Sequence, residues 1–334
     1  MTGNGEPAAE ADASSGRDAL PDEQRRLLAR AIRLEWITLG CLSVTIVLVA
    51  TVAGQSQAMK TAWLEDLMSL LPPIAFLVAT RRIGRSPDPE FPYGHHRSIG
   101  VAHLIAASAL LAMGAFLIVD SASTLIAVER PAVGLTVLFG YGIWSGWLMI
   151  AVMAVTSIAP VILGRMKLKL ARPLHDKVLF ADAEMNKADW TTAVATIVGI
   201  VGIGIGIWWA DSAAAILVSF SILRDGGKNM RAAIKGLTDA RARTFDEKEP
   251  HPLLDEIEDA ARAVSWVADA RARVRDEGHV FHVEVFVIAI DGEQARAERC
   301  AALKTNLRAI DWKIHDVVIA PVRELPRFLR PHEG

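Results

Sequence analysis

Four side chains with lone-pair donors share one face of a predicted helix and have the spacing of an ion site. They lie in the segment 181–192, ADAEMNKADWTT, at the start of a long apolar run. At about 100° per residue, Asp182 and Asp189 are nearly eclipsed, while Met185 and Asn186 fall to either side of them. An ionisable group at bilayer depth costs at least about 2.5 kcal/mol, so such a face indicates an ion or proton pathway.

A second apolar run, TAWLEDLMSLLPP, supplies a matching pair of carboxylates. Glu65 and Asp66 are adjacent, so only one of them can face a given partner helix. Pro72–Pro73 removes backbone donors just beyond them and predicts a kink that frees carbonyl groups. Two facing carboxylates repel unless protons or a cation lie between them. We therefore expect Asp66 and Asp189 to form the core of a divalent-cation site that is protonated when empty.

Simpler interpretations stand beside this one. Asp182 lies near the end of its run, where it is either a ligand or a solvated carboxylate, and Met185 is either a ligand or packing. Glu184 and Lys187, three residues apart on the other side of the helix, are expected to pair with each other. His103 and Asp120, in another apolar run, are expected to contact neighbouring helices through hydrogen bonds rather than to bind metal.

The elements that must position these residues are apolar runs close to the length of a membrane span, about 20 residues. The fifth is charged in its first third, and the sixth is only about two-thirds of a spanning length. The runs are 36–54, 58–80, 98–127, 141–164, 180–209 and 210–223.

Basic residues gather in every second connection between these runs. Because cytoplasmic loops hold the excess of Lys and Arg, this alternation predicts the topology. The pattern places both termini in the cytoplasm and requires an even number of spans, so we expect six. The basic residues before the first run are Arg25, Arg26, Arg30 and Arg33. Those between the second and third runs are Arg81, Arg82, Arg85 and Arg97, and those between the fourth and fifth runs are Arg165, Lys167, Lys169, Arg172 and Lys177.

Composition agrees with a membrane protein. The 334 residues are 52% hydrophobic, with a mean hydropathy of +0.30. The net charge of −2 gives no footprint for nucleic acid. The sequence has two cysteines, Cys41 and Cys300, which are too few and too far apart for a disulfide scaffold or a cysteine-based zinc module. Residues 1–24 are small, polar and acidic, which predicts a disordered tail. They do not have the basic and then apolar segments of a signal peptide.

After about residue 240 the composition is that of a small soluble domain. Helical and alternating patterns predict an α-β-β-α-β order over 253–264, 267–275, 279–290, 293–310 and 314–322. The domain has no nucleophile elbow or phosphate loop, so we expect assembly or regulation and no enzyme activity. The predicted divisions are a tail at 1–24, a six-helix membrane domain at 25–240, the small domain at 241–325 and a second tail at 326–334.

Four motifs together resemble the cation diffusion facilitators, a family of divalent metal/proton antiporters. They are FPYGHHRS between the second and third runs, DAEMNKAD in the fifth, WWADSAAAILVSFSILRDG in the sixth and GLTD after it. The resemblance extends from about residue 30 to 322. It implies six transmembrane helices followed by a ferredoxin-like (αββαβ) cytoplasmic domain that dimerises.

The family's transport site usually has two ligands four residues apart on each of the second and fifth helices. Asp66 and Asp189 match the second ligand of each pair, but Ala62 and Met185 stand at the first positions. The chain therefore resembles a variant subgroup that lacks the usual zinc-site histidine. Either the shell is completed by protein ligands or water fills it; the candidates are Asp182, Asn186 and Glu65.

The soluble domain of relatives often binds regulatory metal through His and Asp, which makes His315 and Asp316 secondary candidates. His95 and His96, in the loop after the second run, either capture metal weakly or are simply exposed, and exposure is favoured.

The function implied is efflux of a divalent metal from the cytoplasm by exchange with protons, through alternating access in a homodimer in the cell membrane. The transported ion is Zn²⁺, Mn²⁺, Fe²⁺, Co²⁺ or Ni²⁺, and no cofactor is expected beyond that metal and protons. The partners are the metal, protons, the lipid bilayer and a second copy of the chain, with no nucleic acid. The alternative is a non-transporting sensor or scaffold of the same fold; a membrane enzyme is a third and weaker option.

Overall fold

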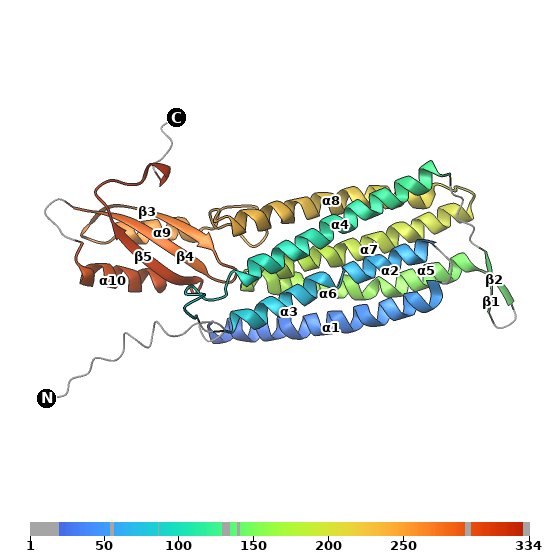
Figure 1. The fold of residues 1–334 in the computed structure, drawn as a ribbon, viewed down its shortest axis with the longest axis horizontal. Coiled ribbons are helices and arrows are strands. Elements are labelled where there is room, and N and C mark those ends of the chain that lie inside the picture. The colour runs from blue at the N-terminus through green and yellow to red at the C-terminus, as the bar shows by residue number, and fades with distance from the viewer. Residues whose placement is uncertain are drawn as a thin grey trace.

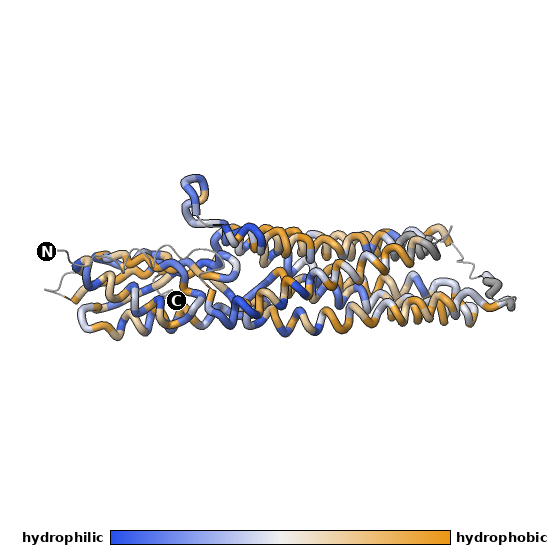
Figure 2. Tube along the Cα trace, turned by 90° about the horizontal axis from the view of Figure 1, so that it is seen from below, coloured by the Kyte–Doolittle hydropathy of each residue, from blue (hydrophilic) through white to orange (hydrophobic). Residues whose placement is uncertain are grey.

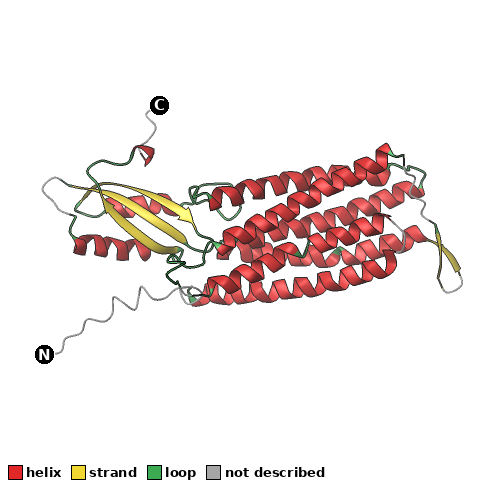
Figure 3. Ribbon diagram, viewed as in Figure 1, coloured by secondary structure: helices red, strands yellow, loops and turns green. Residues whose placement is uncertain are grey.

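Two parts make up the protein, a bundle of long helices and a small domain with a three-stranded sheet at one end of it (Figure 1). The computed structural model describes residues 20–53, 57–85, 87–128, 134–138, 141–290 and 295–329. Figure 3 shows the long helices grouped at one end and the sheet, with further helices beside it, at the other, and a short hairpin at the far end of the bundle.

The bundle is built from long helices joined by short connections. They are α1 (Asp22–Ala53), α2 (Gln57–Met68), α3 (Leu71–Ile83), α4 (Ser98–Ile126), α5 (Ser145–Thr156), α6 (Ile158–Leu174), α7 (Lys177–Gly204) and α8 (Ala210–Leu237). The far hairpin is formed by β1 (Leu135–Leu138) and β2 (Tyr141–Trp144).

Four helical segments in the described residues are long and apolar enough to cross a membrane: Asp22–Leu48, Trp63–Ile83, Ser98–Ile126 and Ser145–Leu174. Their exposed surface is rich in large apolar side chains, as lipid requires. Apolar residues dominate the bundle, and polar residues gather where it meets the sheet domain (Figure 2). The protein is thus a mostly helical membrane protein with a small sheet domain.

The predicted runs differ from the helices at their breaks and ends. The second run is not a kinked helix but two helices, because Pro72 and Pro73 fall in the first turn of α3. The fourth divides at Ser157 into α5 and α6, and α6 continues to Leu174, so part of the predicted basic loop is helical. The sixth run is the first half of α8, which extends to Leu237.

The helix α7, which carries Asp189, is the central helix of the bundle. It packs against α3, α4, α5, α6 and α8, while α8 also packs along α4. Its start is defined by Asp176, whose Oδ1 accepts hydrogen bonds from the backbone N–H of Val178 and Leu179 at 2.8 and 2.9 Å. Such a cap satisfies N–H groups that lack helical partners.

The small domain has the predicted α-β-β-α-β order, with somewhat different ends. Its elements are α9 (Leu253–Arg262), β3 (Val267–Asp276), β4 (Phe281–Ala289), α10 (Ala297–Arg308) and β5 (Ile314–Pro321). The strand order is β3-β4-β5, with β4 antiparallel to β3 and parallel to β5. Alternate residues of β3 and β4, such as Val274, Val283 and Val285, pack with α9 and α10 in one apolar core.

The predicted tails lie largely outside the described residues. Residues 1–19 and 330–334 are not described, and α1 begins at Asp22, inside the predicted tail of 1–24. A short 3-10 helix, Arg327–Leu329, falls within the predicted tail of 326–334.

Candidate metal centre

The break between α2 and α3 contacts α7 through a hydrogen bond to Asp189. Ser69 Oγ donates to Asp189 Oδ1 at 2.8 Å, and Ser69 is 2% exposed. The break follows from the local sequence, because Pro72 and Pro73 have no N–H and cannot bond the carbonyls of Met68 and Ser69. The break therefore supplies a hydroxyl beside the carboxylate of the central helix, and the prolines leave two backbone oxygens without a helical N–H partner.

Asp66 and Asp189 are carboxylates of α2 and α7 within the bundle, and both residues keep partial exposure. The charges of Asp66 and Asp182 act on Asp189, and the positive charge of Lys167 opposes them. In the part of the chain that the structure describes, neither side chain forms an ion pair. Of the two adjacent acids of α2, Glu65 is the more buried and Asp66 the more accessible. Two like charges held in this way need protons or a cation near them.

Asp182 lies in a buried group of three charges. Lys167 Nζ is 2.7 Å from Asp182 Oδ2 and 3.1 Å from Glu35 Oε2, and all three side chains are at most 1% exposed. The expectation that Lys167 lies in a loop was wrong, because α6 continues through it and the two carboxylates balance its charge. Asp182 has a cation of its own here, and its role as a metal ligand stays a prediction.

Met185 and Asn186 also have other partners in this conformation. Met185 is 1% exposed and packs in an apolar cluster that includes Leu110 and Met113. Asn186 Nδ2 donates to the backbone oxygen of Asp182 at 2.8 Å and to its Oδ1 at 3.2 Å. The polar face expected on α7 is thus divided: Asp189 bonds Ser69, whereas Met185 lies in an apolar cluster against which Met68 of α2 packs.

Glu184 and Lys187 do not pair as expected, because each meets a partner on α8. Lys187 Nζ is 3.0 Å from Asp225 Oδ2, and Asn229 Nδ2 donates to Glu184 Oε2. Asn229 Oδ1 also lies 3.3 Å from His103 Nε2, so the expected helix-to-helix contact of His103 is confirmed. These bonds tie α4, α7 and α8 together on the side of α7 away from Ser69 and α2.

His96 is buried and His95 is largely covered where the bundle meets the sheet domain, so the expectation that they are exposed was wrong. His96 is 4% exposed, and the side chain of His95 is 11% exposed. The rings of His96 and His315 lie 5.1 Å apart, whereas Asp316 is bound to His282 Nδ1 at 3.0 Å. Among the described residues, no three His, Cys, Asp or Glu side chains are placed to hold a metal ion.

This burial predicts that acid loosens the junction. Burial, with repulsion from neighbouring histidines, lowers the pKa of His96 to about 4, against about 6.5 in an unfolded chain. The unfolded chain then binds more protons, so the stability from this group is complete above about pH 6.5 and falls as pH drops toward 4. We expect a lower melting temperature at pH 5 than at pH 7.5, and a smaller difference in His96→Gln. Equal pH dependence in the two proteins would contradict this.

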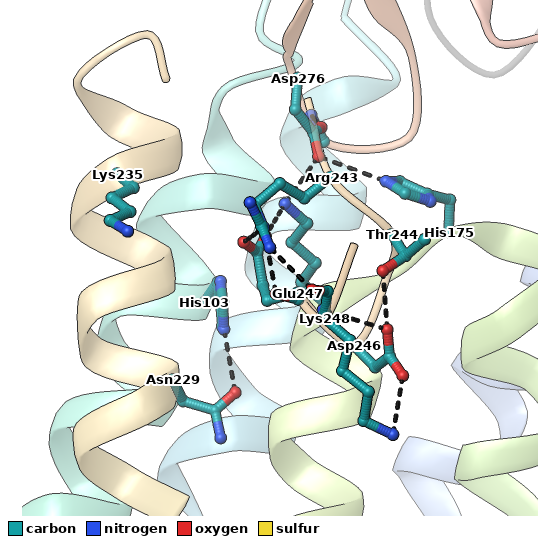
Figure 4. A network of polar contacts seen from close by, with 12 residues as sticks. His103, His175, Asn229, Lys235, Arg243, Thr244, Asp246, Glu247, Lys248 and Asp276 are labelled. Atoms are coloured by element: carbon teal, nitrogen blue, oxygen red, sulfur yellow. Dashed lines mark hydrogen bonds and ion pairs between the residues drawn. The ribbon is translucent and has the colours of Figure 1, made fainter. Parts of the chain in front are cut away.

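The turn before α7 is held to the sheet domain by a polar network, part of which is shown in Figure 4. His175, in a left-handed conformation (φ 51°), lies with Nε2 3.3 Å from Asp276 Oδ2, and Lys177 Nζ is 2.8 Å from the same oxygen. His279 Nε2 is 2.6 Å from Asp176 Oδ2. Burial opposes ionisation of Asp276, but Lys177 and His175 outweigh it and hold its pKa well below the usual value. The start of the central helix is thus fastened to the domain.

Sequence patterns did not single out Ser69 or Glu35, and they placed Lys167 only among the basic residues of a loop. Ser69 could have been found from its place just before Pro72–Pro73, where a helix must break. No local signal identifies the partners of Lys167, because they come from two other helices.

The fold is that of a mostly helical membrane protein with carboxylates inside its helical part. The chain matches the cation efflux transmembrane domain over residues 36–238, more than half of its length, and it belongs to this family, the cation diffusion facilitators.

Curated relatives are metal or uncharacterised transporters. The manganese efflux system protein MneS of Bacillus subtilis is 24% identical over 232 residues, which cover 70% of this chain and 73% of the relative. The uncharacterized transporter YdbO of the same organism is 22% identical, covering 73% and 77%. Mitochondrial metal transporter 1 of Saccharomyces cerevisiae is 26% identical, covering 66% of this chain and 46% of the relative. Family and relatives together support divalent metal efflux and a non-enzymatic transporter.

Proposed function

We propose that this protein exports a divalent cation, chiefly Mn²⁺, from the cytoplasm in exchange for protons. The observation that carries the proposal is the pair of Asp66 and Asp189. These carboxylates lie on two helices, keep partial exposure and have no ion-pair partner among the described side chains. A metal ion and protons compete for the same carboxylate oxygens, so binding of one releases the other. This competition couples the two fluxes.

The donor set favours Mn²⁺ over softer or nitrogen-seeking ions. The groups at the site are carboxylate oxygens, the Ser69 hydroxyl and the free carbonyls of the break, and oxygen donors with water suit Mn²⁺. Zn²⁺ prefers compact sites with nitrogen or sulfur ligands, and no described histidine acts on Asp66 or Asp189. The similarity to a manganese efflux protein points the same way. Fe²⁺, Co²⁺ and Ni²⁺ are the alternative substrates that the test below compares with Mn²⁺. We propose that Asn186 or Asp182 becomes a further ligand in another conformation.

The proposed architecture has six spans: α1, α2 with α3, α4, α5 with α6, α7, and the first half of α8. The last two carry too many charged or polar residues to pass as simple apolar spans, but they pack within the apolar ones. Basic residues then place both termini and the small domain in the cytoplasm. We propose divisions at 25–240 and 241–325, a ferredoxin-like small domain, and alternating access in a homodimer of the cell membrane.

The test is metal uptake by proteoliposomes with an acidic lumen. Full-length protein is expected to carry Mn²⁺ into the lumen while protons leave, and uptake should stop when an ionophore collapses the pH gradient. Zn²⁺, Fe²⁺, Co²⁺, Ni²⁺ and Cd²⁺ are assayed in parallel, and protein-free liposomes are the control. Absence of flux for every ion, from folded protein, would contradict transport and favour a sensor or scaffold. Flux of another ion in preference to Mn²⁺ would correct the substrate alone.

A further inference from the structure

The hydroxyl of Ser69 bonds another helix, which is not where a buried helical hydroxyl ordinarily points. In helices, Ser and Thr side chains commonly donate to the carbonyl oxygen four residues earlier. Ser219 does so in α8, where its Oγ donates to the backbone oxygen of Ala215 at 2.7 Å. Ser69 Oγ donates instead to Asp189 Oδ1 on α7, at 2.8 Å. This bond is therefore a contact between helices and not part of the hydrogen bonding within α2.

Ser69 reaches across to α7 because it lies between two helices. Its backbone N–H still bonds the oxygen of Glu65 at 3.0 Å, but α2 ends at Met68 and α3 begins at Leu71. Pro72, in the first turn of α3, prevents the two from joining as one helix. The residue is 2% exposed, so water does not compete for the hydroxyl. A hydrogen bond to a carboxylate is strong in such surroundings.

The bond leaves most of the Asp189 carboxylate free to accept other partners. A carboxylate has two oxygens with about four lone-pair positions, and Ser69 occupies one of them on Oδ1. In the part of the chain that the structure describes, no hydrogen bond or ion pair reaches Oδ2 of Asp189. Met185, one turn earlier on α7, has no group that could donate and packs in an apolar cluster. Among the described side chains, Ser69 is thus the donor that fixes the direction of this carboxylate.

We propose that Ser69 is a positioning residue of the transport site: its hydroxyl holds the Asp189 carboxylate toward the break between α2 and α3 and leaves Oδ2 for the divalent cation. The proposal rests on the proposed function and deepens it, because it assigns a role to a residue that carries no charge. A ligand that is already held in place loses less freedom when the ion binds. Groups that orient a metal ligand in this way contribute about 10 to 100-fold to metal affinity.

The experiment measures the Mn²⁺ affinity of purified full-length protein and Mn²⁺ uptake by proteoliposomes. Ser69→Ala is expected to weaken the affinity about 10 to 100-fold. It should raise the Mn²⁺ concentration for half-maximal uptake far more than it lowers the maximal rate. Ser69→Thr keeps the hydroxyl and should retain most of the affinity. Ser219→Ala is the matched control, because it removes an equally buried hydroxyl whose bond stays within α8, and its affinity should be unchanged.

Two outcomes would overturn the positioning role. One is a folded Ser69→Ala protein that binds and transports Mn²⁺ like the unaltered protein while Asp189→Asn is impaired. The other is an equal loss of affinity in Ser69→Ala and Ser69→Thr, which would assign the effect to packing at the break. If Ser69→Ala does not fold, Ser69→Cys gives the same information, because a thiol has a similar shape but is a weak donor. Failure of the proposed function is distinguishable, because it appears as unchanged binding and flux in Asp189→Asn.

Discussion

Asp189→Asn is expected to abolish transport while the protein stays folded. The amide oxygen of Asn can still accept the hydrogen bond from Ser69 Oγ, which spans 2.8 Å in the structure, so the contact between α7 and the helix break survives. What is lost is the negative charge. Loss of a group that merely orients a ligand costs about 10 to 100-fold in metal affinity, so loss of a ligand should cost at least about 100-fold.

The measurement is Mn²⁺ uptake under a pH gradient, together with Mn²⁺ affinity of the purified protein. Size-exclusion profile and melting temperature verify that the variant is folded. Glu90→Gln removes one carboxylate outside the bundle and serves as the control. Normal transport by folded Asp189→Asn would remove Asp189 from the site, and with it the principal support for the proposed mechanism.

Lys167→Met is expected to destabilise the protein by about 3 to 5 kcal/mol. The ammonium group bridges Asp182 on α7, at 2.7 Å, and Glu35 on α1, at 3.1 Å, from within α6, and none of the three side chains is more than 1% exposed. Methionine fills a similar volume but leaves two carboxylates buried against each other. The cost is that of an uncompensated buried charge rather than of lost packing.

Thermal unfolding in detergent checks this expectation. Lys169→Met makes the same substitution two residues away on the exposed side of α6 and should change stability by no more than about 0.5 kcal/mol. Replacing all three charges, in Lys167→Met/Glu35→Gln/Asp182→Asn, should restore most of the loss, because no unpaired charge remains. Equal melting temperatures for Lys167→Met and Lys169→Met would show that the ion pairs of Lys167 with Glu35 and Asp182 contribute nothing to stability.

The amino-acid sequence determined the local features. Apolar runs and basic loops indicated a helical membrane protein, and the α-β-β-α-β order of the small domain is confirmed. The same patterns placed Asp66 and Asp189 on separate helices, because helical spacing and hydropathy depend only on neighbours along the chain. Motif resemblance identified the family, which the match over residues 36–238 confirms.

Only the tertiary structure decided which side chains meet. Ser69 and Asp189 are 120 residues apart, and Lys167 lies in a segment that resembled a basic loop. Helical periodicity tells which residues share a face, but the rotation and shift of one helix against another depend on packing across the whole bundle. For this reason Asp182 has a lysine partner and His96 is buried at the junction.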